Sequence, residues 1–190
     1  MKKKLWKRLI LGLLFIVLIP PIFLWWVTLN TYSRIETADD GFVYLLRDKF
    51  KKAGIMKYTY DPLSGNETIV IPDTYGKYPV KGIGGFIGRG APCYFYVDIK
   101  GLTSYVKASP DYSEGKNKET VVYDLTLEIG PNIKEIYSER LVYLTKNTRY
   151  VVRFYVKCDP SNSAFYSEDG ILYHKNRKIV DGLLYWNQDY

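Results

Sequence analysis

Few side chains in this sequence have types and spacings that could do chemistry. The only histidine, His174, lies beside a polar turn. With one histidine, neither a histidine-based metal cluster nor a histidine-containing catalytic triad can be assembled. Two acidic doublets, Asp39-Asp40 and Glu168-Asp169, could serve a glycosidase only if their carboxylates were paired across a cleft. Adjacent residues of a strand point to opposite faces, so neither doublet is such a pair, and solvated turn carboxylates are predicted instead.

A glycine-rich stretch resembles a nucleotide-binding loop only in part. Gly82, Gly84 and Gly85 are followed by Gly88 and Gly90. If Gly82 and Gly84 are the first two glycines of a G-x-G-x-x-G pattern, Gly88 falls one place too late to be the third. The next residues favour a strand, whereas a dinucleotide site requires a helix there. We therefore predict a turn between strands, no cofactor and no enzymatic activity.

The two cysteines could form a disulfide outside the cell, where such bonds are chemically allowed. In the stack of four strands that the sequence predicts, Cys93 and Cys158 lie at opposite ends of strands that are two positions, or ~10 Å, apart. This separation exceeds the ~7 Å limit between the Cα atoms of a disulfide. Two reduced, half-buried thiols are expected, although a bridge stays an open alternative.

Tyrosine is the compositional outlier, with 19 residues. Alternation along the run from Tyr94 to Val97 places Tyr94 and Tyr96 on one face and Phe95 and Val97 on the other. If Phe95 and Val97 face the core, the tyrosines face outward. Together with Tyr155, they are the predicted partner-binding face, because a tyrosine ring offers contact area and a polar tip. The alternative is that these tyrosines only cover an outer sheet.

The net charge of +7 is concentrated at one end of the chain. Five of the 27 basic residues lie within the first eight positions, which leaves 22 basic against 20 acidic residues in the remainder. Nucleic-acid binding is therefore not expected, since no basic stripe is left to neutralise phosphates.

An uncharged segment from Leu9 to Leu29 follows this basic flank. Its 21 residues would span ~31 Å as a helix, close to the ~30 Å hydrocarbon core of a bilayer. Trp6 at one edge, and Trp25 and Trp26 at the other, are the predicted membrane anchors. The positive-inside bias predicts a cytoplasmic amino terminus and a single-pass protein of the cell membrane. A cleaved signal peptide is the alternative, but the apolar stretch is long and no A-x-A site follows it.

Residues 41–60 are ambiguous. Phe42, Leu46 and Phe50 recur at helical spacing, whereas the segments 41–45 and 55–60 are rich in strand formers. We favour a hairpin over a helix.

Four apolar strand-like runs follow, and their spacing suggests a repeat. Ile71, Val97, Ile129 and Val156 mark them at steps of 26, 32 and 27 residues. A period of 20 to 50 residues is typical of a solenoid, in which each unit buries its apolar face on its neighbour. We therefore expect a mainly β, leucine-rich-repeat-like solenoid of about four irregular rungs with hairpin caps. Residues 170–173 and 178–186 are expected to form the terminal capping hairpin.

The segment from Ile69 to Gly84, IVIPDTYGKYPVKGIG, resembles a BspA-type leucine-rich repeat of bacterial surface proteins. The segment from Tyr166 to Tyr173, YSEDGILY, is similar to that family's recurring DGVLY segment. The resemblance covers about residues 41–173. An Ala-Phe pair expected after the second apolar turn is replaced by Gly85-Phe86 and by Arg140-Leu141. The resemblance implies a repeat scaffold for adhesion or recognition, without catalytic residues.

The sequence therefore predicts a basic cytoplasmic flank at 1–8, a transmembrane helix at 9–29, a linker at 30–40 and an extracytoplasmic repeat domain at 41–190. The predicted function is non-catalytic binding of a surface protein or glycan. The first alternative is an accessory subunit of a membrane complex that works through its transmembrane helix, and the second is a cell-envelope hydrolase.

Overall fold

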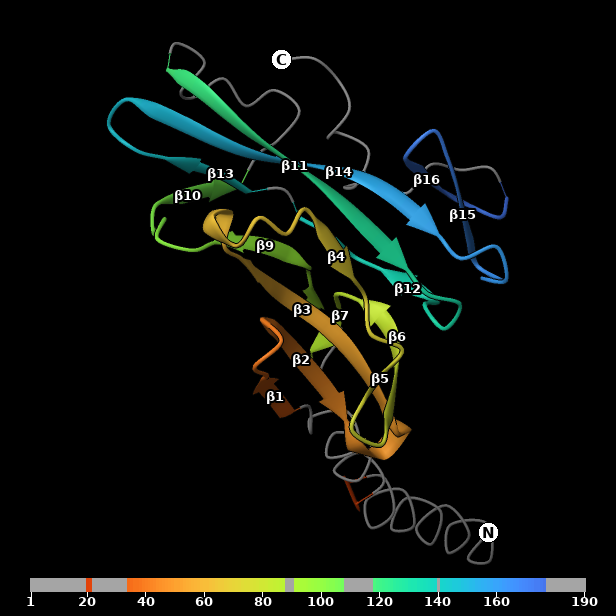
Figure 1. Ribbon diagram of the computed structural model, residues 1–190. Helices are drawn as coiled ribbons and strands as arrows, with labels where there is room; N and C mark the ends of the chain where they lie inside the picture. The colour runs from red at the N-terminus through yellow and green to blue at the C-terminus, as the bar shows by residue number, and fades with distance from the viewer. Residues whose placement is uncertain (1–19, 22–33, 88–90, 108–117, 140, 177–190) are drawn as a thin grey trace, which may run out of the picture.

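The computed structural model describes residues 20–21, 34–87, 91–107, 118–139 and 141–176. These residues form a mainly β structure with two large sheets and two small hairpins (Figure 1). Two short 3-10 helices, η1 (Asp48–Phe50) and η2 (Pro62–Ser64), lie in turns that follow strands of the first sheet.

The first sheet, called sheet A here, is built around one long strand, β3 (Lys52–Tyr60). Its other six strands are β1 (Arg34–Thr37), β2 (Phe42–Arg47), β5 (Thr74–Tyr75), β6 (Tyr78–Ile83), β9 (Tyr96–Ile99) and β12 (Glu135–Ile136). β2 pairs antiparallel with one edge of β3. On the other edge β6 and then β9 pair with successive parts of β3, both in parallel.

The second sheet, sheet B, has the strand order β10-β13-β14-β11-β4. These strands are β10 (Tyr105–Lys107), β13 (Leu141–Leu144), β14 (Thr148–Cys158), β11 (Glu119–Ile129) and β4 (Thr68–Val70). β4, β11 and β14 are parallel, whereas β13 and β10 run antiparallel to their neighbours. The small hairpins are β7 (Gly85–Ile87) with β8 (Ala91–Cys93) and β15 (Phe165–Glu168) with β16 (Ile171–His174).

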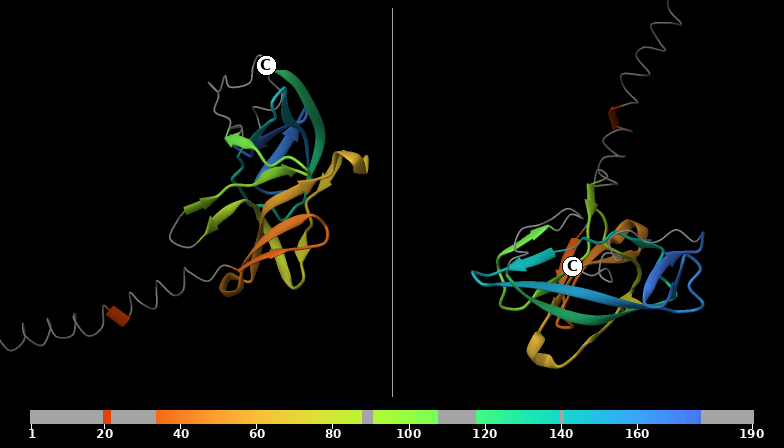
Figure 2. Two further views of the ribbon diagram at one scale, coloured as in Figure 1. Left: turned by 90° about the vertical axis from the view of Figure 1, so that its left-hand side faces the viewer. Right: turned by 90° about the horizontal axis from the view of Figure 1, so that it is seen from above.

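The inner faces of the two sheets pack against each other around one hydrophobic core. The alternation of side chains along each strand explains this, because the apolar residues of β11 and β14 fall on the same face. Between the sheets, the rings of Tyr60 and Tyr123 meet edge to face at 5.4 Å. Fully buried members of the core include Tyr44, Ile55, Ile69, Ile83, Phe95, Leu125, Leu127 and Phe165. Figure 2 shows the long strands of sheet B crossing over sheet A.

The predicted solenoid is wrong. Both large sheets are mixed, since each combines parallel with antiparallel strands. Three of the four expected rungs, now β4, β11 and β14, are parallel neighbours in sheet B. The fourth, containing Val97, belongs to β9 in sheet A. The near-regular spacing arises because the chain returns repeatedly to both sheets, and spacing alone cannot assign a strand to a sheet.

The terminal capping hairpin also differs from the prediction. Ile171–His174 pairs with the preceding Phe165–Glu168, and the turn between them is at Asp169 and Gly170. The expected partner at 178–186 lies outside the described residues. Strand pairing with the nearer segment needs only a two-residue turn, which is the commonest hairpin connection.

The hairpin favoured for residues 41–60 is confirmed. β2 and β3 pair antiparallel from Phe42↔Tyr58 to Arg47↔Lys52. η1 makes the turn, which ends at Lys51 in a left-handed conformation with φ 47°.

The described residues contain no helix long and apolar enough to cross a membrane. The predicted fold included a transmembrane helix at 9–29. The described part of the chain contains no such helix. Apart from Pro20 and Pro21, that segment and its anchors Trp6, Trp25 and Trp26 lie outside the described residues.

Candidate ligand-contact surface

The outer face of sheet B carries two cross-strand ion pairs with an aromatic residue between them. Arg153 on β14 donates from Nε and Nη2 to the two carboxylate oxygens of Asp124 on β11, at 2.6 and 2.7 Å. Two residues further along each strand, Thr126 lies opposite Tyr155. After another two residues, Lys157 and Glu128 form an ion pair at 3.6 Å. The period of two along parallel strands in register produces this arrangement.

Tyr155 is 52% exposed, yet its ring has a fixed support. A Cβ atom placed on Gly170 would lie 2.4 Å from ring carbons of Tyr155, so the ring packs directly on the glycine backbone. Gly170 has φ +79°, a conformation that glycine adopts without steric cost. Its carbonyl accepts a hydrogen bond from the N–H of Val156 at 2.8 Å, which ties the β15–β16 turn to β14. The Asp169-Gly170 turn thus holds an exposed aromatic ring in place.

Beside Tyr155 lies an open groove with a volume of about 400 Å³. Its polar lining comes from Glu67, Asp124, Thr126, Arg153 and Tyr155. The hydrogen bonds from Arg153 lower the pKa of Asp124 below its usual range, so this carboxyl is ionised and balanced by the guanidinium. Glu67 forms no ion pair with any residue that the structure describes. The lining therefore carries a net negative charge at neutral pH.

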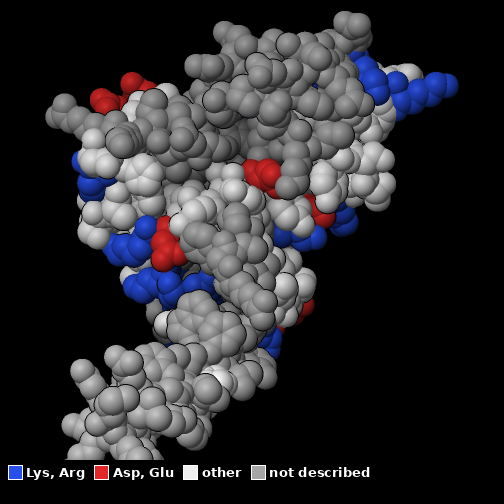
Figure 3. All heavy atoms as spheres, turned by 180° about the vertical axis from the view of Figure 1, so that it is seen from behind, with Lys and Arg blue, Asp and Glu red and all other residues white. Residues whose placement is uncertain are grey.

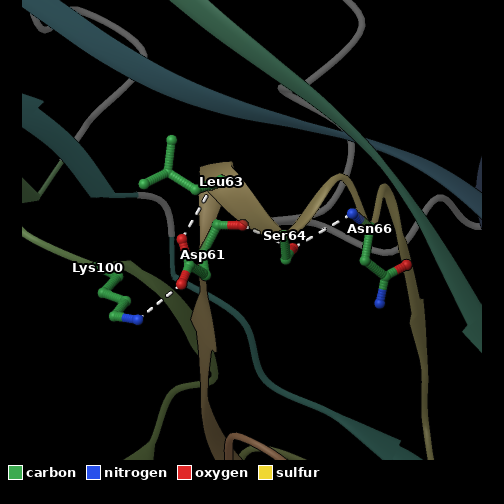
Figure 4. Close-up of polar contacts among 5 residues, drawn as sticks. All are labelled: Asp61, Leu63, Ser64, Asn66 and Lys100. Atoms are coloured by element: carbon green, nitrogen blue, oxygen red, sulfur yellow. Dashed lines mark hydrogen bonds and ion pairs between the residues drawn. The ribbon is translucent and has the colours of Figure 1, made fainter.

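The turn that leads into Glu67 is tightly hydrogen-bonded and presents an exposed leucine (Figure 4). Asp61 accepts from the N–H of Leu63 at 3.0 Å and from Nζ of Lys100 at 2.7 Å. The hydroxyl of Ser64 donates to the carbonyl of Asp61 and accepts from the N–H of Asn66. Leu63 is 95% exposed. This turn therefore fixes an apolar side chain beside the start of β4.

Tyr96 begins β9 of sheet A, and Tyr94 lies just before that strand. Tyr94 is 40% exposed, while Phe95 and Val97 are buried, so the predicted alternation of this run is confirmed. Tyr96 is partly buried, and this burial raises the pKa of its hydroxyl. Near it, Lys57 and Asp98 form an ion pair at 3.1 Å. The structure thus places Tyr94 and Tyr96 together but leaves Tyr155 on the outer face of sheet B.

The face opposite to that of Figure 1 shows no single-sign patch among the coloured residues. Basic and acidic side chains lie next to one another there (Figure 3).

The residues considered as catalytic candidates lie in strands, turns and packing contacts of the fold. His174 is exposed, and its ring lies 5.0 Å from that of Phe165. Asp40 accepts from the hydroxyl of Tyr44 at 2.7 Å and from the N–H of Phe42 at 2.9 Å. Glu168 ends β15 and Asp169 begins the hairpin turn. Across the described ranges, no group of three or more His, Cys, Asp or Glu residues could hold a metal ion.

The first three glycines of the glycine-rich stretch and the two cysteines lie in strands or between them. Gly82 lies within β6, and Gly84 and Gly85 occupy the bend into β7, where both have positive φ. Of the glycines predicted to form a turn between strands, Gly84 links β6 to β7, Gly82 and Gly85 lie within those strands, and Gly88 and Gly90 lie outside the described residues. Cys93 and Cys158 are free and half-buried, and burial raises the pKa of both thiols.

Sequence reasoning missed the groove. Asp124, Arg153 and Glu67 come from three strands or their approaches, and only the registers Asp124↔Arg153 and Thr126↔Thr68 place them around one groove. No local pattern encodes that register. Tyr155, predicted from the sequence to belong to the partner-binding face, is exposed and lies between the buried Phe154 and Val156 of β14.

No family model, no curated protein and no solved structure matches the chain. The resemblance to BspA-type proteins stays a prediction from the sequence.

Proposed function

We propose that the chain is a non-catalytic recognition module, anchored through residues 9–29 and facing the outside of the cell membrane. Its contact surface is the outer face of sheet B around Tyr155. The observation that carries the proposal is the exposed Tyr155 ring, held against Gly170 at the side of a groove lined by Glu67 and the Asp124–Arg153 pair.

Three physical features favour recognition at this place. An aromatic ring provides a large contact area and is a frequent anchor of binding surfaces. Because packing on Gly170 already restricts the ring, little side-chain entropy is lost when a partner binds. The groove adds a few polar groups at fixed positions, which orient a ligand.

Capture experiments with the full chain in a neutral detergent test the proposal. The wild-type protein should retain one defined protein or glycan from solubilised cell-envelope material, and Tyr155→Ala should retain it about tenfold less, which corresponds to roughly 1.4 kcal/mol. Tyr94→Ala is the matched control, because Tyr94 is similarly exposed but lies with the other sheet. Equal retention by wild type and Tyr155→Ala would overturn the proposal, and loss with Tyr94→Ala alone would move the contact surface to sheet A.

A further variant separates this function from the accessory-subunit alternative. Replacing residues 9–29 with an unrelated uncharged apolar sequence should leave capture unchanged if the segment is only an anchor. Loss of the partner in this variant, with Tyr155 intact, would assign recognition to the replaced segment.

A further inference from the structure

The strand β11 is longer than β4, one of its two neighbours in sheet B. β11 pairs with β14 along all of Glu119–Ile129, but with β4 only from Thr126 to Glu128 (Figure 1). Among the described residues, no strand pairs with the same edge of β11 between Glu119 and Leu125. This leaves an open edge about five residues, or ~17 Å, long.

The register shows which backbone groups face that edge. The N–H of Thr126 donates to the carbonyl of Glu67 at 2.7 Å, and the carbonyl of Glu128 accepts from the N–H of Ile71 at 3.0 Å. Since backbone groups alternate in direction along a strand, Thr120, Val122 and Asp124 direct their N–H and C=O groups toward the open edge. Such a row is a template for another strand.

The open edge leads into the groove beside Tyr155. β4 begins where the open part of β11 ends, and Glu67 and Asp124 line the groove at this junction. A strand that continues the line of β4 would therefore direct alternate side chains toward the groove and toward the sheet interior. Val122, 39% exposed, is an apolar residue of this open edge.

We propose that an extended, basic segment of a partner protein adds to sheet B as a strand beside β11 and places a Lys or Arg side chain in the groove. The inference rests on the proposed function and names the chemical class of the partner. The backbone groups of Thr120, Val122 and Asp124 recognise the extended main chain.

Charge selects the side chain. Glu67 has no counter-ion among the described residues, and Asp124 is already neutralised by Arg153. A cation between Glu67 and Tyr155 gains an ion pair and a contact with the aromatic ring. Glu119 adds a further exposed acidic residue at the far end of the edge. Edge pairing with a second copy is disfavoured, because it would bring two acidic edges together.

The test uses the synthetic peptide acetyl-KVKVKVK-amide with a fluorescent label, and the full chain in neutral detergent. In one further peptide the backbone nitrogen of every lysine is methylated, and in another the backbone nitrogen of every valine is methylated. A strand donates N–H groups to its neighbour from alternate residues only, so one N-methylated peptide should bind at least about tenfold more weakly while the other binds like the parent. Equal binding by both, or no detectable binding of the parent peptide, would overturn the inference.

Protein variants provide the second arm. Val122→Pro removes an N–H that faces the open edge and leaves the ladder with β14 intact, so it should weaken peptide binding at least about tenfold. Val122→Thr keeps the N–H and should bind normally. Glu67→Gln should reduce binding about threefold or more, and acetyl-EVEVEVE-amide should not bind. Unchanged binding by Val122→Pro would contradict strand addition.

The outcomes separate the two proposals. If Val122→Pro still captures the envelope partner while Tyr155→Ala loses it, the recognition surface stands and the strand-addition inference fails. A partner that proves to be a glycan would likewise overturn strand addition and leave the recognition surface standing. If Tyr155→Ala and Val122→Pro both capture normally, both proposals fail.

Discussion

Gly170 sets the position of the residue on which recognition is proposed to depend. Its φ of +79° disfavours any side chain, and a Cβ atom would lie 2.4 Å from the Tyr155 ring. Gly65 has a similar φ of +66°, but a Cβ atom there would meet nothing within 4 Å. The two positions therefore separate the cost of the backbone conformation from the displacement of the ring.

Gly170→Ala should lower the free energy of unfolding by about 1–3 kcal/mol and weaken partner capture, because the left-handed conformation is strained and Tyr155 is displaced. Gly65→Ala should cost about 1 kcal/mol and leave capture unchanged. Urea unfolding and the capture assay measure the two quantities. Normal capture by Gly170→Ala would show that the support of Tyr155 is irrelevant to binding.

For individual residues, the sequence predicted which face of a strand a side chain points to, but not which residues of distant strands lie together. The alternation from Tyr94 to Val97 is confirmed, because burial of Phe95 and Val97 follows from local periodicity. That Glu67 and Arg153 line one groove could not be predicted, since it depends on pairing between strands that are distant in the chain.

At the scale of elements, Asn162 joins two connections that the sheets alone do not tie together. Its side-chain amide donates to the carbonyls of Gly130 and Ile133 at 2.8 and 3.0 Å. Its side-chain oxygen accepts from the N–H groups of Ala164 and Phe165. Asn162 is 1% exposed. The link between β11 and β12 is thereby fixed to the entry of β15.

Asn162→Ala should lower the free energy of unfolding by about 3 kcal/mol or more, because four backbone groups lose their partner in a buried site. Asn132→Ala is the control. Asn132 is less buried, and its contacts with Asp73 and Lys81 are 3.4 and 3.3 Å long. The control should cost less than about 0.5 kcal/mol in the same denaturant titration. Equal costs for the two variants would contradict this role of Asn162.

The positions of several strands could be predicted, but most of their partners could not. The β2–β3 hairpin was predicted because its two strands are adjacent in the sequence. β9 was assigned to a stack with β4 and β11, whereas it pairs with β3. An apolar run identifies a buried strand, but it carries no information about which sheet receives it.

At the scale of the whole molecule, buried tyrosines link stability to alkaline pH. Burial, followed by the hydrogen bond to Asp40, raises the pKa of Tyr44 above that of an exposed tyrosine. Burial and the nearby charge of Asp98 do the same to the pKa of Tyr143, whose hydroxyl donates to the carbonyl of Val97 at 3.0 Å. The folded state therefore keeps protons that the unfolded state releases above pH ~10.

The contribution of Tyr44 and Tyr143 to the free energy of unfolding should be constant with pH below pH ~10 and should fall as the pH rises above it. Urea unfolding at a series of alkaline pH values, with tyrosinate absorbance followed in parallel, measures this decline. Tyr143→Phe should be less stable than wild type at neutral pH but should show a shallower alkaline decline. A stability that stays constant up to pH ~11.5 would contradict the assignment.

The order in which the chain visits the two sheets also determines when the protein can fold during its synthesis. β3 belongs to sheet A, β4 to sheet B, β6 and β9 to A, β11 to B, β12 to A and β14 to B. Thr68 can pair with Thr126 only after β11 has been synthesised, and β11 can pair with β14 only after β14 has been synthesised. Pairing over such distances is slow because long loops must close first. An unfinished chain therefore exposes unpaired strands until Cys158 has been made, so productive folding has to follow the completion of both sheets.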